Sequence, residues 1–121
     1  MTDRATDCLV AEEIMKWKRG STWTAAYPRY AQLVENPYFH QACPFFTRDM
    51  SAVWPVVERL QAEGVMVNIE NSQRGWTSLL TIVAGDVAYE GWAVAATAPR
   101  AICEAALRLT ENRNALTEVA I

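Results

Sequence analysis

This 121-residue sequence is short of the residues on which most enzyme chemistry depends. His40 is its only histidine, so any mechanism that needs an imidazole base would have to use that one side chain. The five glycines lie singly along the chain and form no phosphate-binding loop. We therefore expect a protein that is not an enzyme and that holds no metal and no cofactor.

Cysteines and long apolar runs are scarce as well. Cys8, Cys43 and Cys103 are odd in number and lie 35 and 60 residues apart, which fits neither a zinc site nor a set of disulfides. We interpret them as buried free thiols. The chain has no apolar run long enough for a membrane span, and its first residues lack the positive and then apolar order of a signal peptide. These features predict a cytoplasmic protein that does not contact a membrane.

Basic residues are few and scattered, with 11 basic against 14 acidic residues and a net charge of −3. Proteins that bind nucleic acid normally gather their cations in one patch. The order of elements predicted below also occurs in the double-stranded RNA-binding domain, but that domain needs a cation-rich helix start. Here the closing helix offers Arg100, with Glu104 one turn later. We expect no binding to DNA or RNA duplexes.

What the chain does contain is 51% apolar residues, enough to build one core, and we expect a single domain over residues 1–121. Helical spacing of apolar residues predicts helices over residues 3–18 and 47–63, with Thr47 as the cap of the second. Trp54 falls on the apolar stripe of that helix and should be buried, while Pro55 predicts a kink or a late start. The helix carboxylates are expected to face solvent; they are Glu12, Glu13, Glu58 and Glu63.

The second half predicts a sheet and a closing helix. Runs of strand-forming residues at 65–70, 76–83 and 88–96 are separated by turn residues, which favours a sequential antiparallel meander. Thr97 and Pro99 then begin a helix that we expect to end near residue 109, before a polar tail from about residue 110. The fold class is α+β, a three-stranded antiparallel meander packed with helices.

Residues 20–46 form an aromatic segment that is punctuated by three of the five prolines and, together with Trp17, holds eight of the chain's 12 aromatic residues. Leaving so much ring surface in water would cost about 25 cal/mol per Å². The segment must therefore pack or bind, and two interpretations stay open: a small second core, or a surface on which rings and arginines bind a ligand or a partner. The candidate ligand-binding residues are Trp23, Tyr27, Arg29, Tyr30, Tyr38 and His40.

Three stretches carry a resemblance to a known family. They are LVAEEIMKW at residues 9–17, FTRDMSAVWPVVERLQAEG at residues 46–64 and TAPRAICEAAL at residues 97–107. In this order they resemble the phage ABA-sandwich domain family, small proteins of bacterial viruses and prophages. The resemblance implies an α/β/α sandwich and a phage origin. With that origin, the cytoplasm predicted from the missing signal peptide is the host cytoplasm. It implies no activity, because the family supplies no catalytic residues to carry over.

Two functional hypotheses follow. The first is a non-enzymatic phage-encoded binding protein that sequesters a host nucleotide-type signal or otherwise counters host defence, through ring stacking and arginine contacts to phosphate. The alternative is a structural or interaction module whose aromatic segment forms a homodimer or contacts a host or virion protein. A ligand-binding protein should have a concave pocket lined by Arg29 and the rings, whereas an interaction module should have a flat apolar patch.

Overall fold

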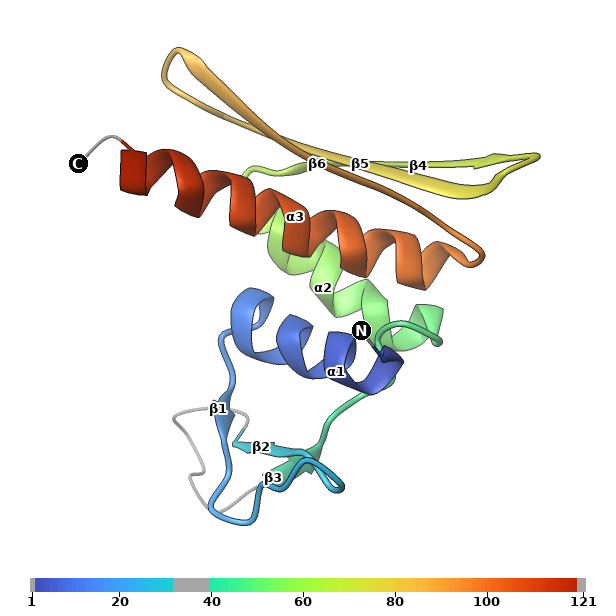
Figure 1. The fold of residues 1–121 in the computed structure, drawn as a ribbon, viewed down its shortest axis with the longest axis vertical. Helices are drawn as coiled ribbons and strands as arrows, with labels where there is room; N and C mark the ends of the chain where they lie inside the picture. Colours follow the sequence, from blue (N-terminus) through green and yellow to red (C-terminus); the bar gives the residue numbers. More distant parts are fainter. Residues whose placement is uncertain (1, 32–39, 120–121) are drawn as a thin grey trace.

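The computed structural model describes residues 2–31 and 40–119, which form an α+β fold with two antiparallel sheets (Figure 1). The α+β class predicted from the sequence is confirmed. In chain order the elements are α1 (Asp3–Leu9), the π-helix η1 (Val10–Ile14), β1 (Lys18–Arg19), β2 (Arg29–Ala31), β3 (His40–Ala42), α2 (Met50–Ala62), β4 (Met66–Ser72), β5 (Gly75–Ala84), β6 (Val87–Ala95) and α3 (Ala98–Val119).

The larger sheet is the predicted meander, with strand order β4-β5-β6 and all pairs antiparallel. Its strands begin and end within two residues of the predicted positions. Helix α3 packs on β6 and β5, and the backbones come close because Gly91 has no side chain. A Cβ at Gly91 would overlap the Ala105 carbonyl and the Leu109 backbone. The buried alanines of α3 let the helix lie flat on the sheet; they are Ala101, Ala105 and Ala106.

The helices lie between the two sheets (Figure 1). Helix α3 lies against one face of the meander, α2 contacts both α3 and β4, and α1 lies beyond them, next to the small sheet β1-β2-β3. Aromatic rings join α1 and η1 to the aromatic segment, since Trp17 lies 6.4 Å from Tyr30 and 5.9 Å from Phe46 between ring centroids. Among the described residues no helix is long and apolar enough to cross a bilayer.

Helix α2 differs from the prediction in two ways. Its cap is Asp49, whose Oδ1 accepts from the Ser51 N–H at 2.9 Å, and not Thr47. Trp54 is 51% exposed, so the prediction that it is buried was wrong. The face that packs inward consists of Val53, Val56, Val57 and Leu60. Trp54 shares its side of the helix with Glu58 and Gln61, which are both exposed.

The ends of the other two helices also differ from those predicted. Thr2 caps α1 through Oγ1, which accepts from the Ala5 N–H at 3.1 Å, but the helix widens into η1 instead of continuing as α-helix to residue 18. Helix α3 runs on to Val119, so the predicted end at residue 109 was wrong. Its extension is held by the sheet: Arg108 and Asn112 donate to the Trp92 and Glu90 carbonyl oxygens at 2.7 and 2.6 Å.

Candidate binding pocket beside Trp23

A pocket of about 480 Å³ lies between α1 and the connection from β1 to β2. We call it the Trp23 pocket. Its volume falls in the range of sites that hold small organic ligands. Its walls combine one indole, two arginines, one carboxylate and one thiol with small apolar side chains. The lining residues are Thr2, Arg4, Ala5, Cys8, Leu9, Glu12, Arg19, Trp23 and Ala25.

The small sheet positions the indole of Trp23. Arg19 on β1 pairs with Tyr30 on β2, and the Gly20 N–H donates to the Arg29 carbonyl at 2.9 Å, which extends the pairing into the connection. The backbone N–H of Trp23 then donates to the Gly20 carbonyl at 3.0 Å and closes a turn. This turn brings the Trp23 ring, which is half-buried, against the main core.

Glu12 connects the pocket to the core. One of its oxygens accepts from Arg19 Nε at 2.8 Å, and the other accepts from the Tyr30 hydroxyl at 3.0 Å. Glu12 is half-buried, so the expectation that it faces solvent was wrong for this residue. The hydrogen bond to Glu12 raises the pKa of Arg19, and burial raises the pKa of the Tyr30 hydroxyl, with the Cys8 thiol beside it acting in the same direction.

Arg19 is thereby held over the indole. Its guanidinium carbon lies 3.7 Å from the centroid of the Trp23 ring, a cation–π contact. The side chain remains 54% exposed, so N–H groups that do not bind Glu12 are accessible to solvent. The arrangement presents an aromatic plane and a cation side by side.

Arg4 is the second arginine that lines the pocket. Its guanidinium donates to Asp7 at 2.9 Å and to the Cys43 and Pro44 carbonyl oxygens at 2.9 and 3.2 Å. It also lies 4.1 Å above the ring of Phe45. These contacts fix α1 on the segment that follows β3 and hold Arg4 in one orientation.

The structure brings only part of the predicted site together. Trp23 lines the pocket, whereas the Tyr30 ring is fully buried and its hydroxyl lies behind Glu12. Tyr27 is 76% exposed, and neither Tyr27 nor the exposed Arg29 lines the pocket. His40 lies on β3, but its side chain and the whole of Tyr38 fall outside the part of the chain that the structure describes.

The α1 side of this pocket was not predicted from the sequence. Arg4, Cys8 and Glu12 are spaced by four residues, which places them on one face of a helix, and this spacing is a signal that could have found them. The spacing does not predict which residues pack against this face, because that depends on how the aromatic segment folds back. In the described parts of the chain, His, Cys, Asp and Glu do not gather in groups of three that could hold a metal ion.

Comparison with known proteins decides the family. Residues 8–107 match the family described as phage ABA sandwich domain. The chain belongs to this family. It is also similar in structure to a phage protein from Bacillus cereus ATCC 14579, known from a crystal structure, with a TM-score of 0.64 over 92% of this chain and 89% of that chain. The two sequences are 20% identical, so this similarity shows the fold alone. No match was found among the curated proteins.

The family assignment confirms the resemblance drawn from three short stretches, and the α+β fold of the described residues is consistent with a sandwich architecture. The matched range also runs through the aromatic segment, which the three stretches had left unmatched. Six of the nine residues that line the Trp23 pocket, Cys8 and Trp23 among them, lie inside the matched range, while Thr2, Arg4 and Ala5 lie before it.

Proposed function

We propose that this phage ABA sandwich protein is a non-enzymatic binding protein that holds a nucleotide-type small molecule in the Trp23 pocket. By capturing such a molecule in the host cytoplasm it would withdraw a signal from host defence. The observation that carries the proposal is that Trp23 and two arginines, Arg4 and Arg19, line one pocket of about 480 Å³, with the Arg19 guanidinium over the indole.

The base is expected to stack on Trp23. A nucleobase and a guanidinium are both flat and bind the same kind of surface, and Arg19 already lies on the indole at 3.7 Å. Because more than half of the Arg19 side chain is exposed, it can swing outward and let a base take its place. Stacking of a base on an aromatic side chain contributes about 1–3 kcal/mol.

The phosphates are expected to bind Arg19 and Arg4. Hydrogen bonds between a guanidinium and a phosphate are charge-assisted and contribute about 1.5–3 kcal/mol each. Arg4 is held by Asp7 and two backbone carbonyls, so little of its freedom is lost on binding. Glu12 offers acceptor oxygens to a sugar hydroxyl or a base amine, and its charge disfavours ligands whose phosphates approach that wall.

The ligand is expected to be held and not converted. Cys8 lies on the pocket wall, and a thiol must lose its proton before it can attack a ligand. The Tyr30 hydroxyl and the Cys43 thiol lie near Cys8, and burial raises the pKa of both groups, so neither acts as a base near neutral pH. The carboxylate on the same wall, Glu12, already accepts hydrogen bonds from Arg19 and Tyr30.

Calorimetric titration with mono-, di- and cyclic nucleotides tests the proposal. Trp23→Ala and Arg19→Gln should each weaken binding by about 10-fold or more. Two variants serve as matched controls: Trp54→Ala removes an exposed tryptophan outside the pocket, and Arg29→Gln removes an exposed arginine that does not line it. Absent heats across the nucleotide panel would contradict the nucleotide proposal, and a loss caused by Arg29→Gln but not by Arg19→Gln would contradict the location.

One observation favours an interaction module, but through the meander and not through the aromatic segment of the alternative hypothesis. The face of the meander turned away from α3 carries exposed apolar side chains: Trp92 is 57% exposed and Met66 is 66% exposed. Trp92 pairs across the strands with Leu79, and Val94 with Thr77, so these residues share one face. Sedimentation of the wild type beside Trp92→Ser measures whether this face joins two copies, and a concentration-dependent dimer abolished by the substitution would support the alternative.

A further inference from the structure

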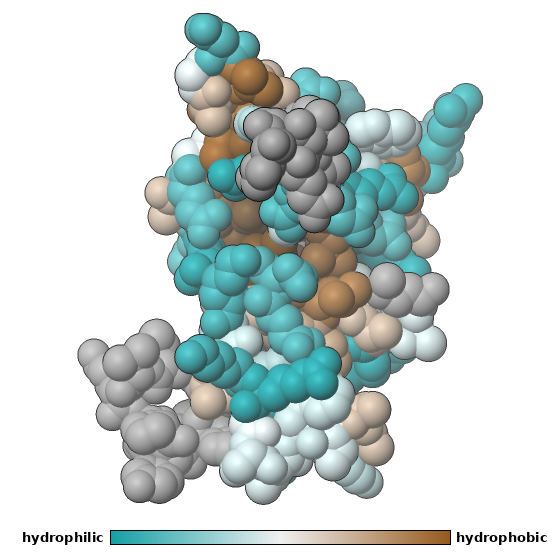
Figure 2. Space-filling model, turned by 60° about the vertical axis from the view of Figure 1, so that its left-hand side comes forward, coloured by the Kyte–Doolittle hydropathy of each residue, from teal (hydrophilic) through white to brown (hydrophobic). Residues whose placement is uncertain are grey.

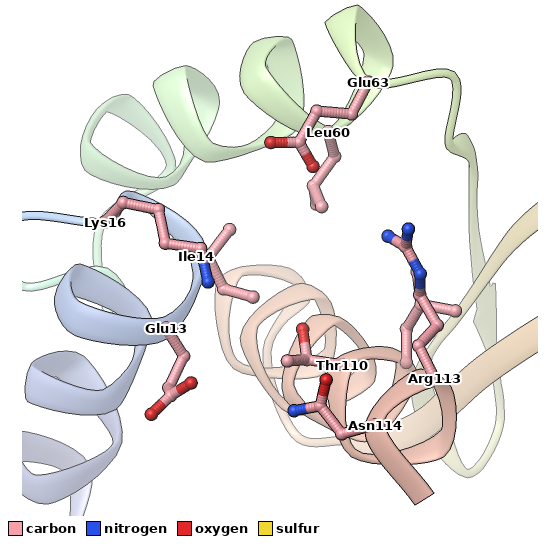
Figure 3. A pocket seen from close by; sticks show the side chains of 9 residues that line it. Glu13, Ile14, Lys16, Leu60, Glu63, Thr110, Arg113 and Asn114 are labelled. Carbon is pink, nitrogen blue, oxygen red and sulfur yellow. The ribbon is translucent and has the colours of Figure 1, made fainter. Parts of the chain in front are cut away.

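A second pocket, of about 320 Å³, lies where three helical segments meet. We call it the three-helix pocket. The end of η1, the last turn of α2 and the later part of α3 each supply part of its wall (Figure 3). Its lining residues are Glu13, Ile14, Lys16, Leu60, Glu63, Leu109, Thr110, Arg113 and Asn114.

The floor of this pocket is apolar and its rim is charged. Ile14, Leu60 and Leu109 belong to the core and are at most 5% exposed. Around them, Figure 3 shows the side chains of Lys16, Glu63 and Arg113 entering from different sides. In the view of Figure 2, apolar surface is visible between hydrophilic side chains in the middle of the molecule.

Lys16 occupies a backbone conformation that suits glycine better. Its φ is +59°, and among the described residues it is the one non-glycine with a positive φ. The conformation arises because η1 ends in a wide turn in which the Trp17 N–H donates to the Ala11 carbonyl at 2.9 Å. At such helix ends glycine is the usual residue. Within residues 2–31 and 40–119, no hydrogen bond or ion pair engages the Lys16 ammonium. Strained residues of this kind cluster at functional sites.

The opposite charge comes from α2. Glu63 is the C-cap of α2, next to the backbone carbonyls that end the helix, where the helix dipole favours a cation. Its carboxylate lies 3.5 Å from Arg59, and the two side chains are 45% and 40% exposed, so this ion pair is weak and can be rearranged. Glu13 adds a second carboxylate to the rim.

We infer that the three-helix pocket binds a small zwitterion with an apolar body, the chemistry of an apolar α-amino acid. The rim holds two cationic and two anionic side chains, so its formal charge is balanced and it favours neither a free cation nor a free anion. The ligand carboxylate pairs with Lys16, its ammonium pairs with Glu63, and its side chain covers Ile14, Leu60 and Leu109. A volume of about 320 Å³ lies at the lower end for ligand sites, which suits a small metabolite.

Titration of the wild-type protein with three related probes tests the inference, with the methyl NMR signals of Ile14, Leu60 and Leu109 as the readout. L-Leucine carries both charges, N-acetyl-leucine lacks the ammonium, and leucinamide lacks the carboxylate. Leucine should bind at least about 10-fold more tightly than either analogue, because each analogue loses one of the two ion pairs, that with Lys16 or that with Glu63. Equal affinity for all three probes, or no shift at millimolar leucine, would overturn the inference.

Two substitutions assign each charge to its partner. Lys16→Met should remove the preference for leucine over leucinamide, and Glu63→Gln should remove the preference for leucine over N-acetyl-leucine. Lys18→Met and Glu58→Gln are the matched controls, since these exposed residues do not line the pocket. Preferences that survive both Lys16→Met and Glu63→Gln would overturn the assignment. Trp23→Ala should leave leucine binding unchanged, which separates this site from the Trp23 pocket.

Discussion

Replacing Asp7 with alanine should destabilise the protein more than any exposed charge change, because Asp7 fastens α1 to the segment after β3. The Asp7 side chain is fully buried. Its Oδ1 accepts from the Thr47 N–H at 2.8 Å, and its Oδ2 accepts from Arg4 at 2.9 Å. Removing the carboxylate leaves the buried Thr47 N–H without a partner, which costs about 1–3 kcal/mol. The Arg4 pair adds at most about 1 kcal/mol, since Arg4 is 36% exposed and keeps its two carbonyl partners.

The expected loss for Asp7→Ala is therefore about 1–4 kcal/mol of unfolding free energy. With an m-value of about 1.5–2 kcal/mol per M, the urea midpoint should fall by about 0.5–3 M. Asp7→Asn keeps an acceptor for Thr47 and should lose about half as much. Asp86→Ala, in the exposed turn between β5 and β6, is the control and should stay within about 0.5 kcal/mol. If Asp7→Ala unfolds at the same urea concentration as this control, the buried hydrogen bond to Thr47 is not made.

Three further predictions concern other parts of the fold. Lys16→Gly should raise the unfolding free energy by about 1 kcal/mol in the same urea assay, because it relieves a φ of +59°, and unchanged or lower stability would argue against the strain. Gly91→Ala should cost about 1–3 kcal/mol or more in thermal unfolding, because α3 must move off β6, and an unchanged melting temperature would contradict that packing. In a thiol titration at pH 8, half-buried Cys8 should react before the two buried cysteines. Burial raises the pKa of Cys43 to about 12 and also raises the pKa of Cys103, so their thiolates form only at far higher pH. Equally fast reaction of all three thiols would contradict the burial of Cys43 and Cys103.

The sheet could be predicted closely because its signals are local. Alternation in β4 and the turn residues between strands fix both the pairing and the side-chain faces, and the structure agrees within two residues. The end of α3 could not be predicted from the polar composition of its last turns. That end depends on Arg108 and Asn112 finding carbonyls on β6, a contact between distant parts of the chain. The prediction that Trp54 is buried was wrong for a related reason, since the position of the packed stripe on α2 depends on the elements around the helix.

At the candidate site, too, the local sequence predicted one part, and contacts between distant parts of the chain decide the rest. The concentration of rings in the aromatic segment pointed to Trp23, and the structure places Trp23 on a pocket wall. The other wall comes from α1, where Arg4, Cys8 and Glu12 share one helix face, and no property of that helix alone shows that Trp23 lies opposite. Arg29 was predicted to bind the ligand because it lies among the aromatic residues in the sequence. The pairing of β1 with β2 brings Arg19 to the indole instead.

The most direct test of the proposed function is native mass spectrometry of the full chain recovered from infected host cells, with Trp23→Ala recovered in parallel. The proposal predicts a second mass species in the wild type, heavier by one small ligand, and the released ligand should absorb near 260 nm as nucleobases do. Trp23→Ala should lack this species, while its circular dichroism agrees with that of the wild type. The same bound ligand in both proteins, or a wild type that is always recovered without one, would contradict it.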